Sequence, residues 1–140
     1  MQTVVLYESL TGNTRRAAEL IGAEFARRGH AVVVNSVADI DYQALARAEL
    51  VVVGGWTDGI FLFGQRPGRS WRLKDIPALD GKKAAVFCTF ALDPGKVLDK
   101  TQEIVAGRGA EVLGGMTIRR DKLEQGALDF ADRILGVLAG

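Results

Sequence analysis

The sequence is organised around a short polar turn near its start, Ser9-Leu10-Thr11-Gly12-Asn13-Thr14. The apolar run from Val4 to Tyr7 precedes this turn and predicts a buried strand. Apolar residues at helical spacing, from Ala17 to Phe25, follow it and predict a helix. The first backbone N–H groups of a helix have no acceptor within the helix, and the helix dipole adds about half a positive charge at that end. A strand that leads through hydroxyl-bearing residues into a helix is therefore a candidate anion site.

The residues of this turn narrow the kind of anion. Gly12 allows the backbone to approach a ligand closely, and Ser9, Thr11 and Thr14 offer hydroxyl groups. The G-x-x-x-x-G-K-S/T pattern of a nucleoside-triphosphate loop is absent, and so is the G-x-G-x-x-G pattern of a dinucleotide fold. Hydroxyl and backbone N–H groups without a lysine predict a single terminal phosphate monoester.

The turn resembles the phosphate loop of the flavodoxin family, whose pattern is S/T-x-T-G-x-T. Ser9, Thr11, Gly12 and Thr14 match every fixed position of that pattern. In that family the loop holds the phosphate of FMN without a basic side chain. The resemblance covers the whole chain, and it implies an FMN-binding protein that shuttles electrons between redox partners.

Strands and helices alternate along the rest of the chain. Four more strands are predicted, at residues 31–34, 50–54, 84–88 and 112–118. Helices are predicted over 13–28, ending before Gly29, and over 42–48 after an Asp41 N-cap. A short helix is predicted near 70–75, and a longer one over 94–106 after an Asp93 N-cap. The last predicted helix runs from an Asp121–Glu124 capping box to Leu138. Five βα units predict an α/β three-layer sandwich with a parallel sheet. The resemblance implies a flavodoxin-like sheet of five strands in the order 2-1-3-4-5, within a single domain spanning residues 1–140.

With that strand order, the turns after strands one, three and four meet at the carboxyl edge of the sheet, where such sheets bind ligands. The second and third of these turns bring Trp56 and Phe90, whose rings suit a planar heterocycle. Flavodoxins commonly place a tryptophan and a tyrosine against the flavin from these two loops, so Trp56 matches the first role and Phe90 lacks the phenol of the second. The alternative is that both rings pack in the core or as a lid. The predicted FMN-binding residues are Ser9, Leu10, Thr11, Gly12, Asn13, Thr14, Gly55, Trp56, Thr57, Asp58, Gly59, Thr89, Phe90, Ala91 and Asp93.

The chain departs from the family pattern in two of these loops. The family often has Trp-Gly-Asp in the loop after strand three, whereas Thr57 follows Trp56 here. A β-branched residue resists positive φ, so the Asp58–Gly59 peptide is the candidate for any rotation toward the flavin. The next loop carries Thr89, Phe90 and Ala91 in place of the common Gly-x-Gly-Asp run.

Composition excludes several other classes of protein. The 140 residues suffice for one domain with a real core, and a net charge of +1 gives no indication of nucleic-acid or membrane binding. The single Cys88 rules out an internal disulfide, is expected in the core, and suits a reducing compartment. No signal peptide and no apolar stretch of roughly 20 residues is found, so a cytoplasmic location is expected. No catalytic or metal-ligating set is predicted.

Basic residues near the proposed site suggest a partner. Arg15 and Arg16 lie in the first helical turn, where a bound anion would offset their repulsion from the dipole; the alternative is solvated surface. Four cations cluster in the connection after strand three: Arg66, Arg69, Arg72 and Lys74. We predict that this cluster either docks an acidic redox partner or raises the flavin potentials, unless it too is simply solvated.

Two other functions remain open. One is an NAD(P)H-dependent quinone or flavin reductase of the same fold, for which the apolar residues 60–63 would line a pocket. The other is a flavin-less protein-interaction module. A receiver domain is rejected, because Val53-Gly54 and Cys88-Thr89 do not supply its aspartate and lysine.

Overall fold

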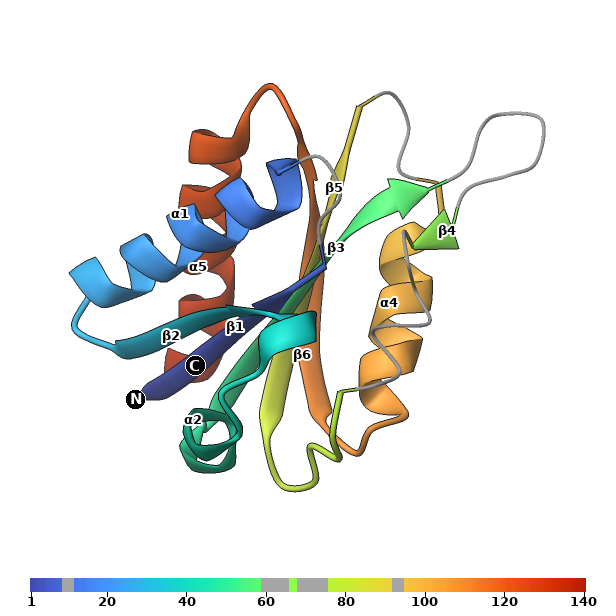
Figure 1. The fold of residues 1–140 in the computed structure, drawn as a ribbon. Coiled ribbons are helices and arrows are strands. Elements are labelled where there is room, and N and C mark those ends of the chain that lie inside the picture. Colours follow the sequence, from blue (N-terminus) through green and yellow to red (C-terminus); the bar gives the residue numbers. More distant parts are fainter. Residues whose placement is uncertain (9–11, 59–65, 68–75, 92–94) are drawn as a thin grey trace.

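A parallel sheet in the order β2-β1-β3-β5-β6 forms the centre of the molecule (Figure 1). The structure is a computed structural model that describes residues 1–8, 12–58, 66–67, 76–91 and 95–140. The parallel strands are β1 (Gln2–Tyr7), β2 (Ala31–Ser36), β3 (Leu50–Asp58), β5 (Lys83–Phe90) and β6 (Glu111–Arg119). These are the five predicted strands, so the predicted α/β class and the order 2-1-3-4-5 are confirmed.

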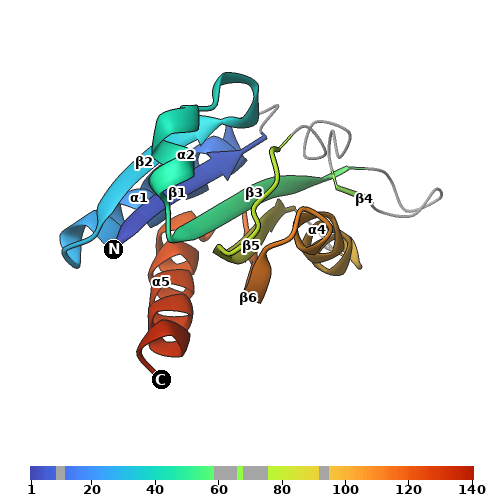
Figure 2. The ribbon, with the colours of Figure 1, turned by 90° about the horizontal axis from the view of Figure 1, so that it is seen from below.

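Helices cover both faces of the sheet (Figures 1 and 2). They are α1 (Asn13–Arg27), α2 (Tyr42–Arg47), α4 (Val97–Ala106) and α5 (Leu123–Ala139), with a 3₁₀ turn at Val37–Asp39. Buried residues of α1 and α5, such as Phe25 and Phe130, pack on one face with Val52 of β3. Leu45 of α2 and Val105 of α4 belong to the core on the other face. The predicted three layers are therefore present.

Local sequence signals set several helix ends as predicted. The helix α1 ends before Gly29, which adopts a left-handed φ of 94°, and Asp41 caps α2 by accepting a hydrogen bond from the Ala44 N–H at 3.0 Å. In α5 the apolar stripe faces the sheet, and its residues Phe130 and Ile134 are fully buried. None of the helices that the structure describes combines the length and apolarity needed to cross a bilayer.

The predicted capping box at the start of α5 is wrong. The helix begins at Leu123, so Lys122 occupies the N-cap position and no side chain caps the helix. The Asp121 carboxylate instead accepts a hydrogen bond from Arg119 at 3.0 Å. The acid lies one residue too early to reach the free N–H groups, and a neighbouring cation attracts it.

The helix α4 also begins later than predicted. It starts at Val97 with Lys96 in the N-cap position, and Gly95 before it has a positive φ of 57°. The predicted start at residue 94 is therefore wrong, while the predicted cap Asp93 lies outside the described residues. The short helix predicted near 70–75 lies outside them as well.

The strand β3 is longer than the apolar run that predicted it. It continues past Gly54 to Asp58, and Trp56 lies opposite Thr89 of β5. Beyond the parallel sheet, Thr57 and Asp58 pair in antiparallel register with β4 (Arg66–Pro67). Figure 2 shows β4 beside the end of β3. The extension thus has backbone partners on β5 as far as Trp56 and on β4 beyond it. Trp56 therefore lies in a strand and not in a loop.

Close packing surrounds Gly54 in the middle of the sheet. The end of the Phe87 ring lies against the Gly54 Cα, where a Cβ would overlap Cζ and Cε1 of the ring. Phe87 is fully buried and makes an edge contact with Phe130 of α5, with ring centroids 5.9 Å apart. Glycine is thus required at this position by the space that the ring occupies.

Candidate functional site

Three segments that lie far apart in the sequence meet at the carboxyl edge of the sheet. The Thr14 hydroxyl, in the first turn of α1, lies 2.8 Å from the Thr89 hydroxyl at the end of β5. Thr14 also donates to the carbonyl oxygen of Gly55 in β3, at 3.4 Å. Both threonines are buried, with exposed fractions of 1% and 3%. We call this contact the Thr14–Thr89 hydroxyl pair; it joins the start of α1 to the end of β5.

The Thr14 hydroxyl points toward the edge of the sheet, where it contacts Thr89 and Gly55. Its predicted role as a donor to an anion stays a prediction. The three segments of the predicted site are nevertheless brought together here. The sequence offered no signal for the pairing itself, because it depends on which strand lies opposite α1.

The N-terminus of α1 is suited to an anion. Gly12 occupies the N-cap position with a left-handed φ of 94°, and it provides no side-chain cap. The first turn contains no acidic residue, and the first intrahelical bond among the described ones runs from Arg16 N–H to Gly12 O at 2.9 Å. The positive end of the helix dipole is therefore not compensated by a carboxylate of the first turn. Arg15 pairs with Glu19 at 3.0 Å, so its charge is partly balanced within the helix.

Trp56 carries a buried polar atom for which the described part of the chain offers no hydrogen-bond partner. Its ring is half-buried at the end of β3, and its Nε1 is buried without a hydrogen-bond partner in the structure. Such a group costs about 1–3 kcal/mol when it has no acceptor. The N–H is thus available to an acceptor on a bound molecule.

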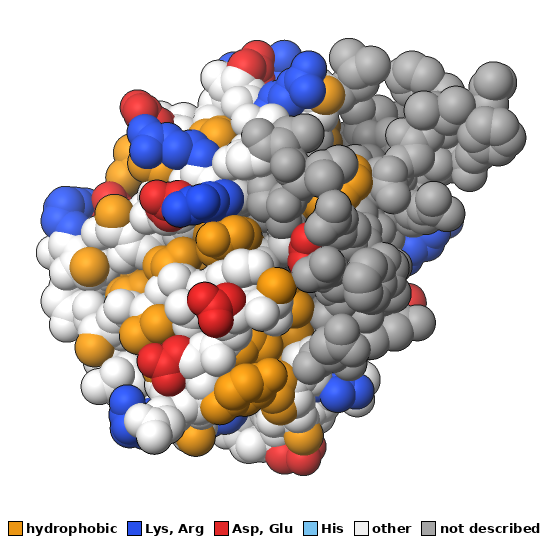
Figure 3. Space-filling model, in the orientation of Figure 1, with side chains coloured by type: hydrophobic (Ala, Val, Ile, Leu, Met, Phe, Trp, Pro, Cys, Tyr) orange, Lys and Arg blue, Asp and Glu red, His pale blue; other side chains and the backbone are white. Residues whose placement is uncertain are grey.

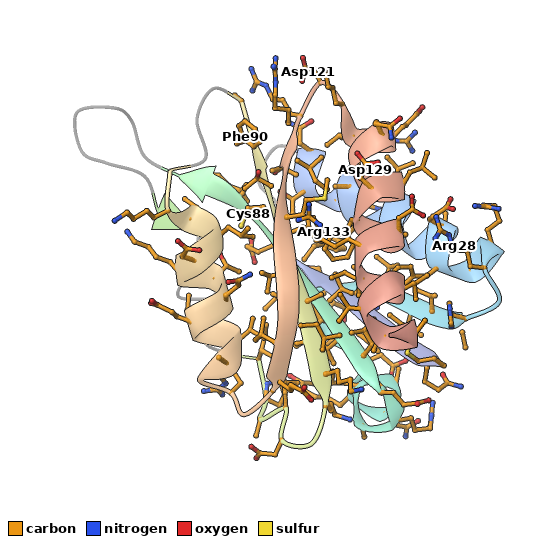
Figure 4. The ribbon with its side chains drawn as sticks, turned by 180° about the vertical axis from the view of Figure 1, so that it is seen from behind. Arg28, Cys88, Phe90, Asp121, Asp129 and Arg133 are labelled. Carbon is orange, nitrogen blue, oxygen red and sulfur yellow. The ribbon has the colours of Figure 1, made fainter. Side chains whose placement is uncertain are left out.

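Phe90 is the last residue of β5 and borders β6, whereas Trp56 lies on β3, the other neighbour of β5. Phe90 borders a hollow of about 260 Å³ whose lining includes Met116 and Ile118 of β6 and Gly126 of α5. Figure 4 shows Phe90 at the end of β5, beside the end of β6. Since β5 separates β3 from β6, a planar ligand touching both Trp56 and Phe90 would lie across the end of β5.

The remaining predicted residues divide into two groups. Asn13 opens α1, Thr57 and Asp58 extend β3, and Ala91 is exposed just after β5. The others lie outside the described residues: Ser9, Leu10, Thr11, Gly59 and Asp93. The same holds for Arg69, Arg72 and Lys74 of the predicted basic cluster, of which only the backbone of Arg66 is described, in β4.

Cys88 is a core residue, as expected. It is fully buried in β5, and its Sγ lies 3.5 Å from the hydroxyl of Thr101, which donates to the Val97 carbonyl at 2.9 Å. Burial raises the pKa of the thiol from 9.0 to about 11, and the Thr101 hydroxyl opposes this only in part. A thiol with this pKa is a poor nucleophile at neutral pH.

The hydroxyl pair leads to a testable expectation for stability. Thr14→Val keeps the shape of the side chain but leaves the Thr89 hydroxyl and the Gly55 carbonyl without this partner. We expect the free energy of unfolding in urea to fall by about 1–2 kcal/mol. The matched control is Thr3→Val, because the Thr3 hydroxyl is buried without a partner and its loss should be neutral or stabilising. Equal destabilisation by both changes would contradict the contribution of the pair.

Known proteins of one family resemble this chain in sequence and in fold. The family model described as Flavodoxin matches residues 5–133. A flavodoxin from Clostridium beijerinckii is 25% identical over 136 residues, covering 95% of this chain and 99% of that protein. The solved structure of two-electron reduced Megasphaera elsdenii flavodoxin superposes with a TM-score of 0.77 at 20% identity, covering 94% of this chain and 96% of that one. Oxidised Flavodoxin 1 from Bacillus cereus gives a TM-score of 0.72 at 22% identity, covering 97% and 98%.

Proposed function

The chain belongs to the flavodoxin family, the FMN-containing electron-transfer proteins, and from this premise we propose which of its residues hold FMN and face its partners. The resemblance stated from the sequence, the cofactor and the electron-transfer function are confirmed at the level of the family. When bound, FMN supplies the group that accepts and releases electrons. The residues of this chain bind it, orient it and limit its contact with water.

We propose that the phosphate of FMN lies at the N-terminus of α1. The observation that carries this proposal is the combination of Gly12 with its left-handed φ, an N-terminus without a side-chain cap, and a first turn without acids. The backbone at the start of α1, from Asn13 onward, the hydroxyls of Ser9 and Thr11, and the backbone of Leu10 would hold the phosphate. The Thr14–Thr89 hydroxyl pair would keep this helix end fixed against the sheet.

We propose that the flavin ring lies beyond the ends of β3 and β5. The buried Nε1 of Trp56 has no hydrogen-bond partner among the residues that the structure describes, so it fits an acceptor on the ligand. Phe90 would contribute apolar contact from the β6 side, and Gly55 and Thr89 would form the wall between the two rings. The residues 57–59, 91 and 93 complete the proposed site.

Glycine at position 12 provides a test with a matched control. Gly12→Ala should weaken FMN binding about tenfold, because an L-residue resists the left-handed conformation at roughly 1–2 kcal/mol and the helix end would shift. Gly81→Ala is the control, since Gly81 also has a positive φ of 79° and open space around it but lies at the opposite edge of the sheet. FMN affinity is measured by quenching of flavin fluorescence during reconstitution. Equal FMN affinity in both variants would contradict the phosphate position, and unquenched tryptophan fluorescence would contradict the role of Trp56.

Flavodoxins interact with redox partner proteins. We propose docking of such a partner at Arg66, Arg69, Arg72 and Lys74, supported by the concentration of positive charge in that stretch of sequence.

We also propose one domain over residues 1–140, since both cores share a single sheet, and a cytoplasmic location, supported by the single reduced cysteine. Steady consumption of NADPH in the presence of a quinone would instead favour a reductase.

A further inference from the structure

A second group of cations surrounds a hollow between α1 and the turn that joins β6 to α5. The hollow measures about 580 Å³. Its lining includes three cations, Arg16, Arg120 and Lys122, and three apolar side chains, Leu20, Leu123 and Leu128. We call these six residues the basic groove. None of them belongs to the cation cluster in the connection after β3.

The basic groove carries an excess of positive charge. Among the ion pairs of the described residues, none involves Arg16, Arg120 or Lys122. Two carboxylates also line the hollow, but Asp121 pairs with Arg119 at 3.0 Å. In the described part of the chain, the lining of the hollow therefore has three cations without an ion pair. Glu124 is its only carboxylate that is not already paired. A surface of this kind attracts acidic groups.

The apolar part of the groove extends along the two helices. Leu20 and Leu128 also line a second hollow of about 270 Å³ between α1 and α5, together with Ala23 and Ala127. On the face of the molecule that Figure 3 shows, which includes α1 and α2, apolar side chains are interspersed with charged ones. An apolar centre with a charged rim is the usual composition of a surface that binds another protein. A small free anion would use the charges and leave the apolar part uncovered.

The basic groove borders the proposed flavin site. The backbone N–H of Arg120 donates to the carbonyl of Phe90 at 2.9 Å. Arg16 lies in the same first turn of α1 as Thr14. Figure 4 shows Phe90 and Asp121 at the same end of the molecule. A protein bound on this groove would therefore lie beside the end of the sheet where electrons would leave or enter.

We propose that the basic groove docks an acidic face of the redox partner protein, as a second contact besides the one proposed at the cation cluster after β3. The role in electron transfer rests on the proposed function, but docking itself requires only the charges and the apolar strip. The three cations of the groove disfavour a basic partner. The Arg120–Phe90 backbone bond links the groove to the end of β5, beside the proposed flavin site. Docking and FMN binding are measured by separate titrations.

The test uses two haem proteins of opposite charge as probes. Acidic cytochrome b5 and basic cytochrome c are titrated into the FMN-loaded protein, and binding is measured by calorimetry at about 20 mM and about 300 mM salt. We expect cytochrome b5 to bind and to lose about tenfold in affinity at the higher salt, because the attraction is between exposed charges. We expect no comparable binding of cytochrome c.

A double charge reversal locates the docking surface. The variant Arg120→Glu/Lys122→Glu should weaken cytochrome b5 binding about tenfold or more. The matched control Arg47→Glu/Lys83→Glu makes the same change of charge with exposed residues away from the carboxyl edge, at the end of α2 and the start of β5, and should change binding less than twofold. FMN affinity and circular dichroism of each variant show that the fold is retained.

The outcomes separate this proposal from the proposed function. Failure of the wild type to bind cytochrome b5 at low salt, or equal weakening by both double variants, would overturn the docking surface. Loss of FMN binding in Gly12→Ala to the same extent as in Gly81→Ala would overturn the proposed phosphate site and leave the docking result standing. Preference for cytochrome c would also overturn the docking proposal.

Discussion

Replacing Gly54 with alanine should lower the free energy of unfolding by about 3 kcal/mol, the upper end of what overpacking usually costs. The added methyl group would overlap the end of the Phe87 ring, which is fully buried and held by Phe130. The ring has no space to retreat, since close-packed interiors contain few voids. For a domain of this size, we expect the melting temperature to fall by about 10 °C.

Two further variants test the cause. Gly136→Ala places the same methyl group in open space on α5, and it should stabilise the protein by about 0.5 kcal/mol through helix propensity. In Gly54→Ala/Phe87→Leu the shorter side chain makes room, so the double variant should lose less stability than the sum of the two single changes. Strict additivity in this cycle would show that the Gly54 contact with Phe87 is not the source of the loss.

Raising the pH from 9 to 11 should remove about 2 kcal/mol of stability that depends on Cys88 alone. The thiol has a pKa of about 11 when folded and an ordinary value of 9.0, because burial disfavours the thiolate. Folding therefore gains its full contribution below pH 9, where the thiol is neutral in both states. The contribution is lost as the pH rises through 11, at about 1.4 kcal/mol per unit of pKa difference.

The comparison with Cys88→Ala isolates this effect from other alkaline titrations. Urea unfolding at several pH values should give a steeper alkaline decline for the native protein than for the variant. Native Cys88 should also react with a thiol reagent at pH 8 only as fast as the protein opens, because the side chain is buried. A parallel decline in both proteins, or rapid labelling of the folded state, would contradict the raised pKa.

The sequence predicted most of the fold because the apolar patterns repeat with clear periods. The stripe that includes Phe130 and Ile134 is typical of a helix, and the run 50–53 is typical of a buried strand. The predictions that were wrong concern ends of elements. These ends depend on particular contacts: Asp121 accepts a hydrogen bond from Arg119, and β3 continues beside β5 and then β4.

The candidate site was predicted less completely. The strand order predicted which turns would meet, and the structure brings Thr14, Gly55 and Thr89 together. The direction of each side chain did not follow, since it depends on strand register. The inward position of Thr14, the unpartnered Nε1 of Trp56 and the place of Phe90 on the β6 side became visible only from the packing.

The antiparallel pairing of β3 with β4 adds a second kind of ladder to the rim of the sheet. The pairs Thr57–Pro67 and Asp58–Arg66 lie beyond Trp56–Thr89, the last pair between β3 and β5. The two ladders share only the strand β3, so the rim can be changed at these four positions while the parallel hydrogen bonds beneath it stay in place.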